Sequence, residues 1–89
     1  MQLSNIKIRL VNKDDELLKA VASVVIDDCF AVHDIKIISG KAGLFISMPS
    51  RRTPDGHYRD IAHPLDSETR DLFSSAILAA YEEEVKNAQ

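Results

Sequence analysis

The stretch Leu18-Lys19-Ala20-Val21-Ala22-Ser23-Val24-Val25-Ile26 decides the fold of this chain. Every second residue from Leu18 to Ile26 is apolar, and this two-residue period is typical of a β-strand that turns one face toward a core. The positions in between hold two valines beside a lysine and a serine, so the second face is partly apolar as well. We therefore expect a long strand in the centre of a sheet, with both faces partly covered.

The residues before and after this stretch predict its neighbours in the sheet. On the N-terminal side, apolar and polar residues alternate up to Leu10. On the C-terminal side, a short turn at Asp27-Asp28 leads into apolar residues whose spacing changes near His33-Asp34, which indicates a β-bulge. We predict strands over residues 6–11, 30–37 and 44–48, joined by turns at 12–16, 27–28 and 39–43.

A hairpin is predicted around Thr53-Pro54-Asp55-Gly56. Proline and aspartate suit a type I turn, and glycine is free to take the left-handed conformation that closes a three-residue hairpin loop. Pro49 has no N–H to donate to a neighbouring strand, so this hairpin should lie at an edge or project as an arm. The register places Thr53 opposite His57, Arg52 opposite Tyr58 and Arg51 opposite Arg59.

The last third of the chain predicts one amphipathic helix. Asp66 or Ser67 can serve as its N-cap, and the acids in its final turns suggest that residues 85–89 fray. Its apolar stripe should pack on the sheet and consists of Leu72, Phe73, Ala76, Ile77, Ala80 and Tyr81. The order of elements predicts a single α+β domain over residues 1–89, with an antiparallel sheet of four to five strands and a single C-terminal helix.

Size and composition describe an ordinary small globular domain. The chain has 89 residues, is 45% hydrophobic and 28% charged, and these values exclude collagen-like and disordered classes. A domain this short hides only about 60% of the surface of its unfolded chain, and one helix can cover only one face of a sheet. We therefore expect a homodimer.

The sequence favours a cytoplasmic protein with no membrane partner. The most apolar run is only half of the ~20 residues that a spanning helix needs. The first residues lack a charged region followed by an apolar one, so no secretory signal is expected. The single cysteine, Cys29, cannot form an internal disulfide, and we interpret it as a small buried hydrophobe in a strand.

Neither a metal site nor a catalytic site is favoured by the spacing of the reactive residues. Cys29 and His33 lie about 13 Å apart along an extended strand, too far to share one metal ion, and His57 and His63 are separated in the same way. No glycine-rich phosphate loop and no nucleophile elbow is present. We therefore expect no catalytic residues, no metal and no cofactor. The alternative is a hydrolytic triad assembled from residues far apart in the sequence.

The charge is unevenly distributed. The chain carries a net charge of −3, but residues 36–63 hold five basic residues against two acidic ones. The hairpin combines cations, hydroxyl groups and an aromatic ring, which are the groups that contact phosphates and stack on bases; they are Ser50, Arg51, Arg52, Thr53, Tyr58 and Arg59. The alternative is that these arginines form salt bridges with Asp55, Asp60 or the acidic helix.

Four runs of sequence resemble the SpoVG family of bacterial septation and stage V sporulation regulators. They are Val32-His33-Asp34-Ile35-Lys36, Gly43-Leu44-Phe45-Ile46, Met48-Pro49-Ser50-Arg51-Arg52-Thr53-Pro54-Asp55-Gly56 and Tyr58-Arg59-Asp60-Ile61-Ala62-His63-Pro64. The resemblance implies a cytoplasmic homodimer that binds DNA and RNA and affects division and gene expression. It also implies that Arg51 and Arg52 are contact residues, with Arg59 and the helix start, where Arg70 lies, as further candidates.

Two hypotheses of function follow, with an enzyme as a third. The first is a dimeric nucleic-acid-binding regulator that uses the basic hairpin. The second is a protein-interaction module that influences septation through partners in the division machinery, by way of the acidic helix face and an exposed sheet edge. An enzyme would need a concave pocket around His33, His57 or His63. Asp60 and His63 are interpreted as structural: Asp60 pairing with an arginine across the hairpin, and His63 setting the path into the helix.

Overall fold

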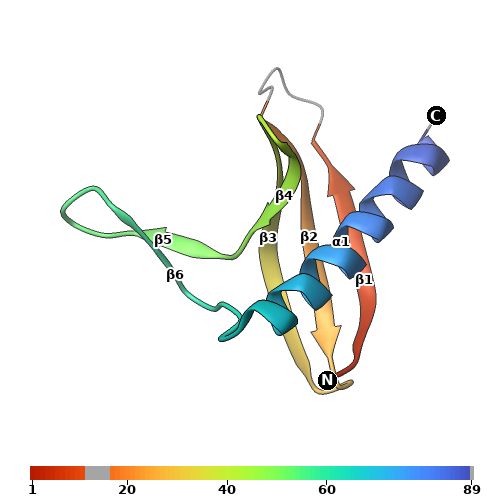
Figure 1. Ribbon diagram of the computed structural model, residues 1–89, viewed down its shortest axis with the longest axis horizontal. Coiled ribbons are helices and arrows are strands. Elements are labelled where there is room, and N and C mark those ends of the chain that lie inside the picture. Colours follow the sequence, from red (N-terminus) through yellow and green to blue (C-terminus); the bar gives the residue numbers. More distant parts are fainter. Residues whose placement is uncertain (12–16, 89) are drawn as a thin grey trace.

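The computed structural model describes residues 1–11 and 17–88, and it shows an antiparallel sheet packed on one helix (Figure 1). The predicted α+β class is therefore confirmed, whereas the predicted turn at 12–16 lies outside the described residues. The main sheet has the strand order β1-β2-β3-β4, with β1 (Leu3–Leu10), β2 (Leu18–Ile26), β3 (Phe30–Gly40) and β4 (Gly43–Ser47). A separate two-stranded sheet, β5 (Ser50–Arg52) and β6 (Tyr58–Asp60), precedes the helix α1 (Ser67–Ala88).

The β2 strand is central, as its two apolar faces predicted. It pairs with β1 on one side and with β3 on the other, and Ala20, Ala22 and Val24 are buried on the face toward α1. The predicted bulge near His33-Asp34 is confirmed, because the β2–β3 register shifts between Ala22 and Val24. Asp34 adopts a φ of 62°, a left-handed conformation that aspartate tolerates better than most residues.

The turn between β2 and β3 corrects the interpretation of Cys29. Asp27 and Asp28 both have positive φ, and the Cys29 N–H donates to the Ile26 carbonyl at 3.1 Å, so the chain reverses direction within three residues. Cys29 is thus the last residue of an exposed turn and not a buried strand residue. An alternating pattern that ran on through the aspartates would have buried it, but the tight turn breaks that alternation.

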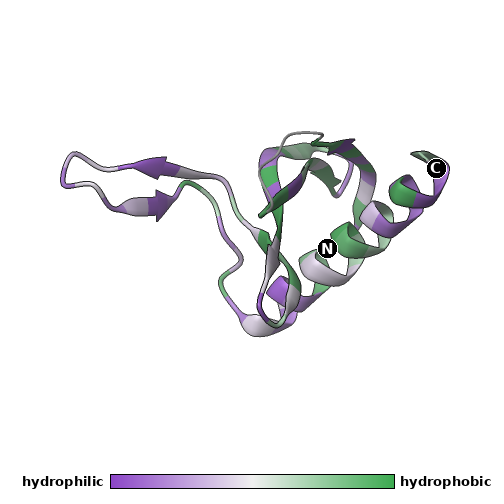
Figure 2. Cartoon of the chain, turned by 90° about the horizontal axis from the view of Figure 1, so that it is seen from above, coloured by the Kyte–Doolittle hydropathy of each residue, from purple (hydrophilic) through white to green (hydrophobic). Residues whose placement is uncertain are grey.

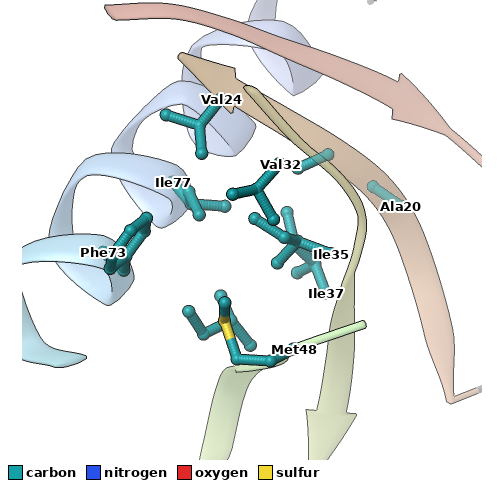
Figure 3. Close-up of a cluster of buried hydrophobic side chains, with 10 residues drawn as sticks. Ala20, Val24, Val32, Ile35, Ile37, Met48, Phe73 and Ile77 are labelled. Atoms are coloured by element: carbon teal, nitrogen blue, oxygen red, sulfur yellow. The ribbon is translucent and has the colours of Figure 1, made fainter. Parts of the chain in front are cut away.

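The core lies between the sheet and α1. Ile35 and Ile37 of β3 and Ile77 of α1 are fully buried, and Phe73 points from the helix toward the same cluster (Figure 3). Seen from above, α1 lies along one side of the sheet (Figure 2). The predicted stripe is confirmed in part: Leu72 is 42% exposed, because the helix turns this residue outward, and Leu78 packs against the core instead.

Both ends of α1 have a physical explanation. Asp66 is the N-cap, because its Oδ1 accepts a hydrogen bond from the Thr69 N–H at 2.7 Å. The backbone and side-chain hydrogen bonds from Thr69 hold the pKa of the Asp66 carboxyl below its ordinary 3.8. The predicted fraying is wrong for residues 85–88, which continue the helix to Ala88, and residue 89 lies outside the described residues. Val85 is half-buried, and Lys86 complements the helix dipole in the last turn.

Candidate nucleic-acid interface

Residues 49–61 form a ribbon, here called the arm, that projects from the main sheet beyond β4 (Figure 1). The Ile61 N–H donates to the Pro49 carbonyl at 2.7 Å and closes the foot of the arm. β5 and β6 pair only with each other and not with the main sheet. The expectation from Pro49, a hairpin that projects as an arm, is confirmed.

The tip of the arm is held by Thr53. The Gly56 N–H donates to the Thr53 carbonyl at 3.0 Å, and the Thr53 N–H donates to the His57 carbonyl at 2.7 Å. Gly56 has a φ of 88°, so it takes the left-handed position that the turn requires. The Thr53 hydroxyl lies within hydrogen-bonding distance of the Asp55 carboxylate and the His57 carbonyl, and its one proton can go to either. Mainly through this hydroxyl, the pKa of the Asp55 carboxyl lies below its ordinary value.

The strand register divides the candidate side chains between the two faces of the arm. Arg51 lies directly opposite Arg59, and Arg52 lies directly opposite Tyr58, as predicted. Because successive residues of a strand point to opposite faces, the arginine pair occupies one face and Arg52 with Tyr58 the other. All four side chains are exposed, together with Ser50, while Thr53 is half-buried. The arm therefore offers cations on both faces and an aromatic ring on one.

Two hollows border the arm. One, of about 370 Å³, is lined by Arg51, Arg52, Arg59 and Asp60 among others. The second, of about 580 Å³, lies at the tip and is lined by residues that include His57, Tyr58 and Arg59. Arg59 borders both, so it sits where a bound strand could follow the ribbon. Such open, cationic hollows can accept phosphate groups without a dedicated enclosed pocket.

The arginines of the arm are not neutralised within residues 1–11 and 17–88. Neither Arg51, Arg52 nor Arg59 forms an ion pair or hydrogen bond with a carboxylate there. This finding disfavours the alternative in which Asp55, Asp60 or the acidic helix pairs with them. In particular, the expected pairing of Asp60 across the hairpin is wrong for the described chain, because Asp60 lies opposite Ser50. The Asp55 carboxylate instead lies within hydrogen-bonding distance of the Thr53 hydroxyl in the turn.

Arg70 and His63 lie away from the arm. Arg70 is exposed in the first turn of α1, and it lines neither hollow of the arm. The His63 ring Nδ1 lies 3.0 Å from the Pro64 carbonyl, a hydrogen bond that supports the expected role of His63 in the path toward α1. The structure thus brings together six of the seven predicted contact residues and leaves Arg70 on a different element.

The reactive side chains do not gather into a metal site in the described chain. No group of three or more His, Cys, Asp or Glu side chains is placed to hold a metal ion among residues 1–11 and 17–88. Each of His33, His57 and His63 borders a hollow, so concavity alone does not separate a binding protein from an enzyme. Over the same residues, no helix has the length and hydropathy needed to cross a membrane.

An apolar hollow of about 400 Å³ lies at the foot of the arm. It is bordered by the β2–β3 turn, by the segment before α1 and by α1 itself, with Phe30, Leu65 and Phe73 among its lining residues. Leu65 is 91% exposed and Phe30 is 62% exposed. Two large apolar side chains this exposed at the border of one apolar hollow mark a surface suited to a protein partner.

Sequence reasoning missed a second group of cations. Lys7, Arg9, Lys19 and Lys36 all lie on the face of the main sheet that points away from α1, here called the open face. Summing charge over long blocks hid three of them, Lys7, Arg9 and Lys19, because the first 35 residues are net acidic. The period-two alternation of β1 carried the signal, since it places Lys7 and Arg9 on one face.

Comparisons with known proteins agree on one family. The sequence model of the SpoVG family matches residues 1–83. A protein of Agathobacter rectalis named "Putative septation protein SpoVG" is 54% identical over 87 residues, covering 98% of this chain and 99% of its own. Proteins of the same name from Caldicellulosiruptor bescii and Clostridium acetobutylicum are 51% and 52% identical, over 92% and 100% of this chain and 92% of their own lengths. The chain therefore belongs to the SpoVG family.

Proposed function

We propose that this protein is a cytoplasmic, non-enzymatic regulator that binds DNA and RNA through the arm and acts in septation and gene expression. The observation that carries the proposal is the set of three exposed arm arginines that no carboxylate neutralises within residues 1–11 and 17–88. Two-stranded ribbons of this width fit the major groove of DNA. The names of the relatives, septation proteins, support the cellular role.

The side chains of the arm offer the different kinds of group that contact phosphates, bases and sugars. Arg51 and Arg59 on one face, with Arg52 on the other, can neutralise phosphates on both sides of a groove. Tyr58 is 70% exposed and can stack on a base or sugar. Ser50 adds an exposed hydroxyl donor at the start of β5, whereas the Thr53 hydroxyl, whose proton stays within the turn, can only accept a hydrogen bond from a ligand. Arg70 would contact the same nucleic acid only if the nucleic acid extends from the arm to the start of α1.

Replacing Arg51 and Arg52 by alanine is expected to weaken binding of a DNA duplex by ~10- to 100-fold near 0.1 M salt, because two phosphate contacts are lost. The slope of log affinity against log salt should fall by about 1.8. Fluorescence anisotropy with a labelled duplex over a salt series measures both. The matched control is Lys41→Ala with Lys86→Ala, which removes the same charge from exposed positions outside the arm. Equal affinities of the two double variants would refute the assignment.

A homodimer is the second part of the proposal. The apolar surface at the foot of the arm, where Phe30 and Leu65 border one hollow, supports it, because a small domain gains stability by covering such side chains. A dimer would present two arms to one nucleic acid and double the local positive field. Light scattering should give twice the chain mass of 9.9 kDa at micromolar concentration. A monomer mass there would contradict this part alone.

The same apolar surface favours a second candidate function, a protein-interaction module that influences septation through division proteins. Two experiments separate the candidates: a gel-shift assay tests binding of DNA and RNA, and a pull-down assay tests binding of division proteins. Binding of neither DNA nor RNA at low salt, together with retention of a division protein that Leu65→Ser abolishes, would support the module. Nucleic-acid binding that is lost with Arg51 and Arg52 supports the regulator.

A further inference from the structure

The main sheet separates charge between its two sides. β1 to β4 contain four basic side chains, and all of them belong to the open face, because Ile8 of β1, Ala20 of β2 and Ile37 of β3 point to the core instead. The basic residues are Lys7, Arg9, Lys19 and Lys36. The acids of the C-terminal part lie on or near α1, which covers the other face (Figure 2). The open face is therefore a second cationic surface that the arm does not include.

The strand register gathers these cations into a row. Arg9, Val21 and Lys36 are cross-strand partners on β1, β2 and β3, so two cations flank one valine at a separation of roughly 10 Å. Lys7 lies two residues before Arg9 on the same face, and Lys19 lies two residues before Val21. None of the four forms an ion pair within the described part of the chain. No carboxylate among residues 1–11 and 17–88 therefore competes with a ligand for their charge.

A hollow of about 230 Å³ opens among these residues. Lys7, Arg9 and Ser23 line it from β1 and β2, and His33 and Asp34 line it from the bulge of β3. The positive φ of Asp34 interrupts the regular alternation of β3 at this point. The hollow therefore combines cations for a phosphate with a hydroxyl, an imidazole and a carboxylate that can form hydrogen bonds with the edges of a base.

An aromatic ring lies on the β4 side of the same face. Phe45 pairs with Ile38 of β3 and is 48% exposed. Its ring lies over Gly40, where a Cβ atom would come within 2.9 Å of the Phe45 Cε1. The absence of a side chain at Gly40 therefore leaves room for the ring, and about half of Phe45 stays exposed. An exposed and positioned ring of this kind is a platform on which an unpaired base can stack.

We propose that the open face binds single-stranded nucleic acid, with Lys7, Arg9, Lys19 and Lys36 on the phosphates and Phe45 under a base. Four strands span about 14 Å, which exceeds the ~12 Å width of the major groove, so this face cannot enter a duplex as the arm can. Stacking on Phe45 also requires an unpaired base. This site does not depend on the arm. A bound nucleic-acid strand that leaves the open face at Ser47 of β4 would continue toward Ser50 at the start of the arm.

The test compares two double variants of the full chain on two probes. Arg9→Gln with Lys36→Gln removes two of the four cations of the open face, and Arg51→Ala with Arg52→Ala removes the two cations of β5. The probes are a labelled oligo-dT of about 12 nucleotides and a labelled duplex. We expect the open-face variant to lose ~10-fold or more in affinity for oligo-dT and to lower its salt slope by about 1.4, with little change for the duplex.

The controls make each proposal refutable by itself. Lys41→Gln with Lys86→Gln removes the same charge elsewhere, and Phe45→Leu, which keeps the apolar volume, should weaken oligo-dT binding by about tenfold. If the open-face variant and Phe45→Leu both bind oligo-dT like the control, the open-face proposal is refuted while the arm can still bind the duplex. A further outcome is that the open-face variant weakens oligo-dT binding while Phe45→Leu does not. In that case, displacement of oligo-dT from the open face by an acidic peptide would overturn the choice of nucleic acid as the ligand.

Discussion

Arg59→Glu is expected to weaken binding of a DNA duplex on the order of 100-fold near 0.1 M salt while stabilising the arm that carries it. Arg51 and Arg59 lie directly opposite each other, and like charges in that position repel. The substitution removes one phosphate contact, adds a negative charge that repels phosphate, and turns the repelling pair into an attracting one. Opposite charges in a cross-strand pair contribute roughly 0.2–1 kcal/mol.

This substitution separates a structural role of the arginines from a binding role. If Arg51 and Arg59 had only a structural role, Arg59→Glu would stabilise the arm and leave the affinity for the DNA duplex unchanged. The state of the arm can be followed by hydrogen exchange of the Thr53 N–H, which donates to the His57 carbonyl at 2.7 Å. Slower exchange together with weaker binding is the expected combination.

Lys41→Glu is the matched control, since it makes the same change of charge in the exposed turn between β3 and β4. It should reduce duplex affinity much less, because Lys41 lies outside the arm and salt screens charges beyond ~10 Å. Equal losses for Arg59→Glu and Lys41→Glu would show that only the net charge of the protein acts. The arm would then not be the contact surface.

The local elements of this fold could be predicted from sequence because their signals are local. The alternation from Leu18 to Ile26 fixed the central strand, and Thr53-Pro54-Asp55-Gly56 set a hairpin whose register the structure reproduces. The bulge at Asp34 was also visible as a change in apolar spacing. In each case the responsible residues are neighbours in the chain, so no tertiary knowledge was needed.

Features that depend on contacts between distant elements could not be predicted in the same way. Cys29 is exposed because both aspartates before it adopt positive φ, which alternation alone does not reveal. Whether the arm arginines meet a carboxylate depends on where the arm projects relative to α1, and no residue pattern encodes that direction. The open face was missed for another reason: its four cations come from three strands, and only their register brings them together.

The helix supplies the prediction with the largest effect on stability, Ile77→Ala. Ile77 is fully buried in the cluster between α1 and the sheet, where Val32 and Ile35 lie close by (Figure 3). Replacing a buried isoleucine by alanine removes its transfer free energy and leaves a cavity, at a cost of about 2–5 kcal/mol. Small domains are stable by only about 5–15 kcal/mol in total, so this loss is a large part of the whole.

Leu72→Ala is the control that gives the comparison its meaning. Leu72 and Ile77 belong to the same predicted stripe of one helix, but Leu72 is 42% exposed and Ile77 is not exposed at all. Alanine is also the better helix former, so Leu72→Ala should change the free energy of unfolding by less than ~1 kcal/mol. Urea unfolding at one fixed protein concentration measures both variants, because dimerisation would make stability depend on concentration. Similar losses for the two variants would mean that α1 packs on the sheet through a helix face that includes Leu72 as much as Ile77.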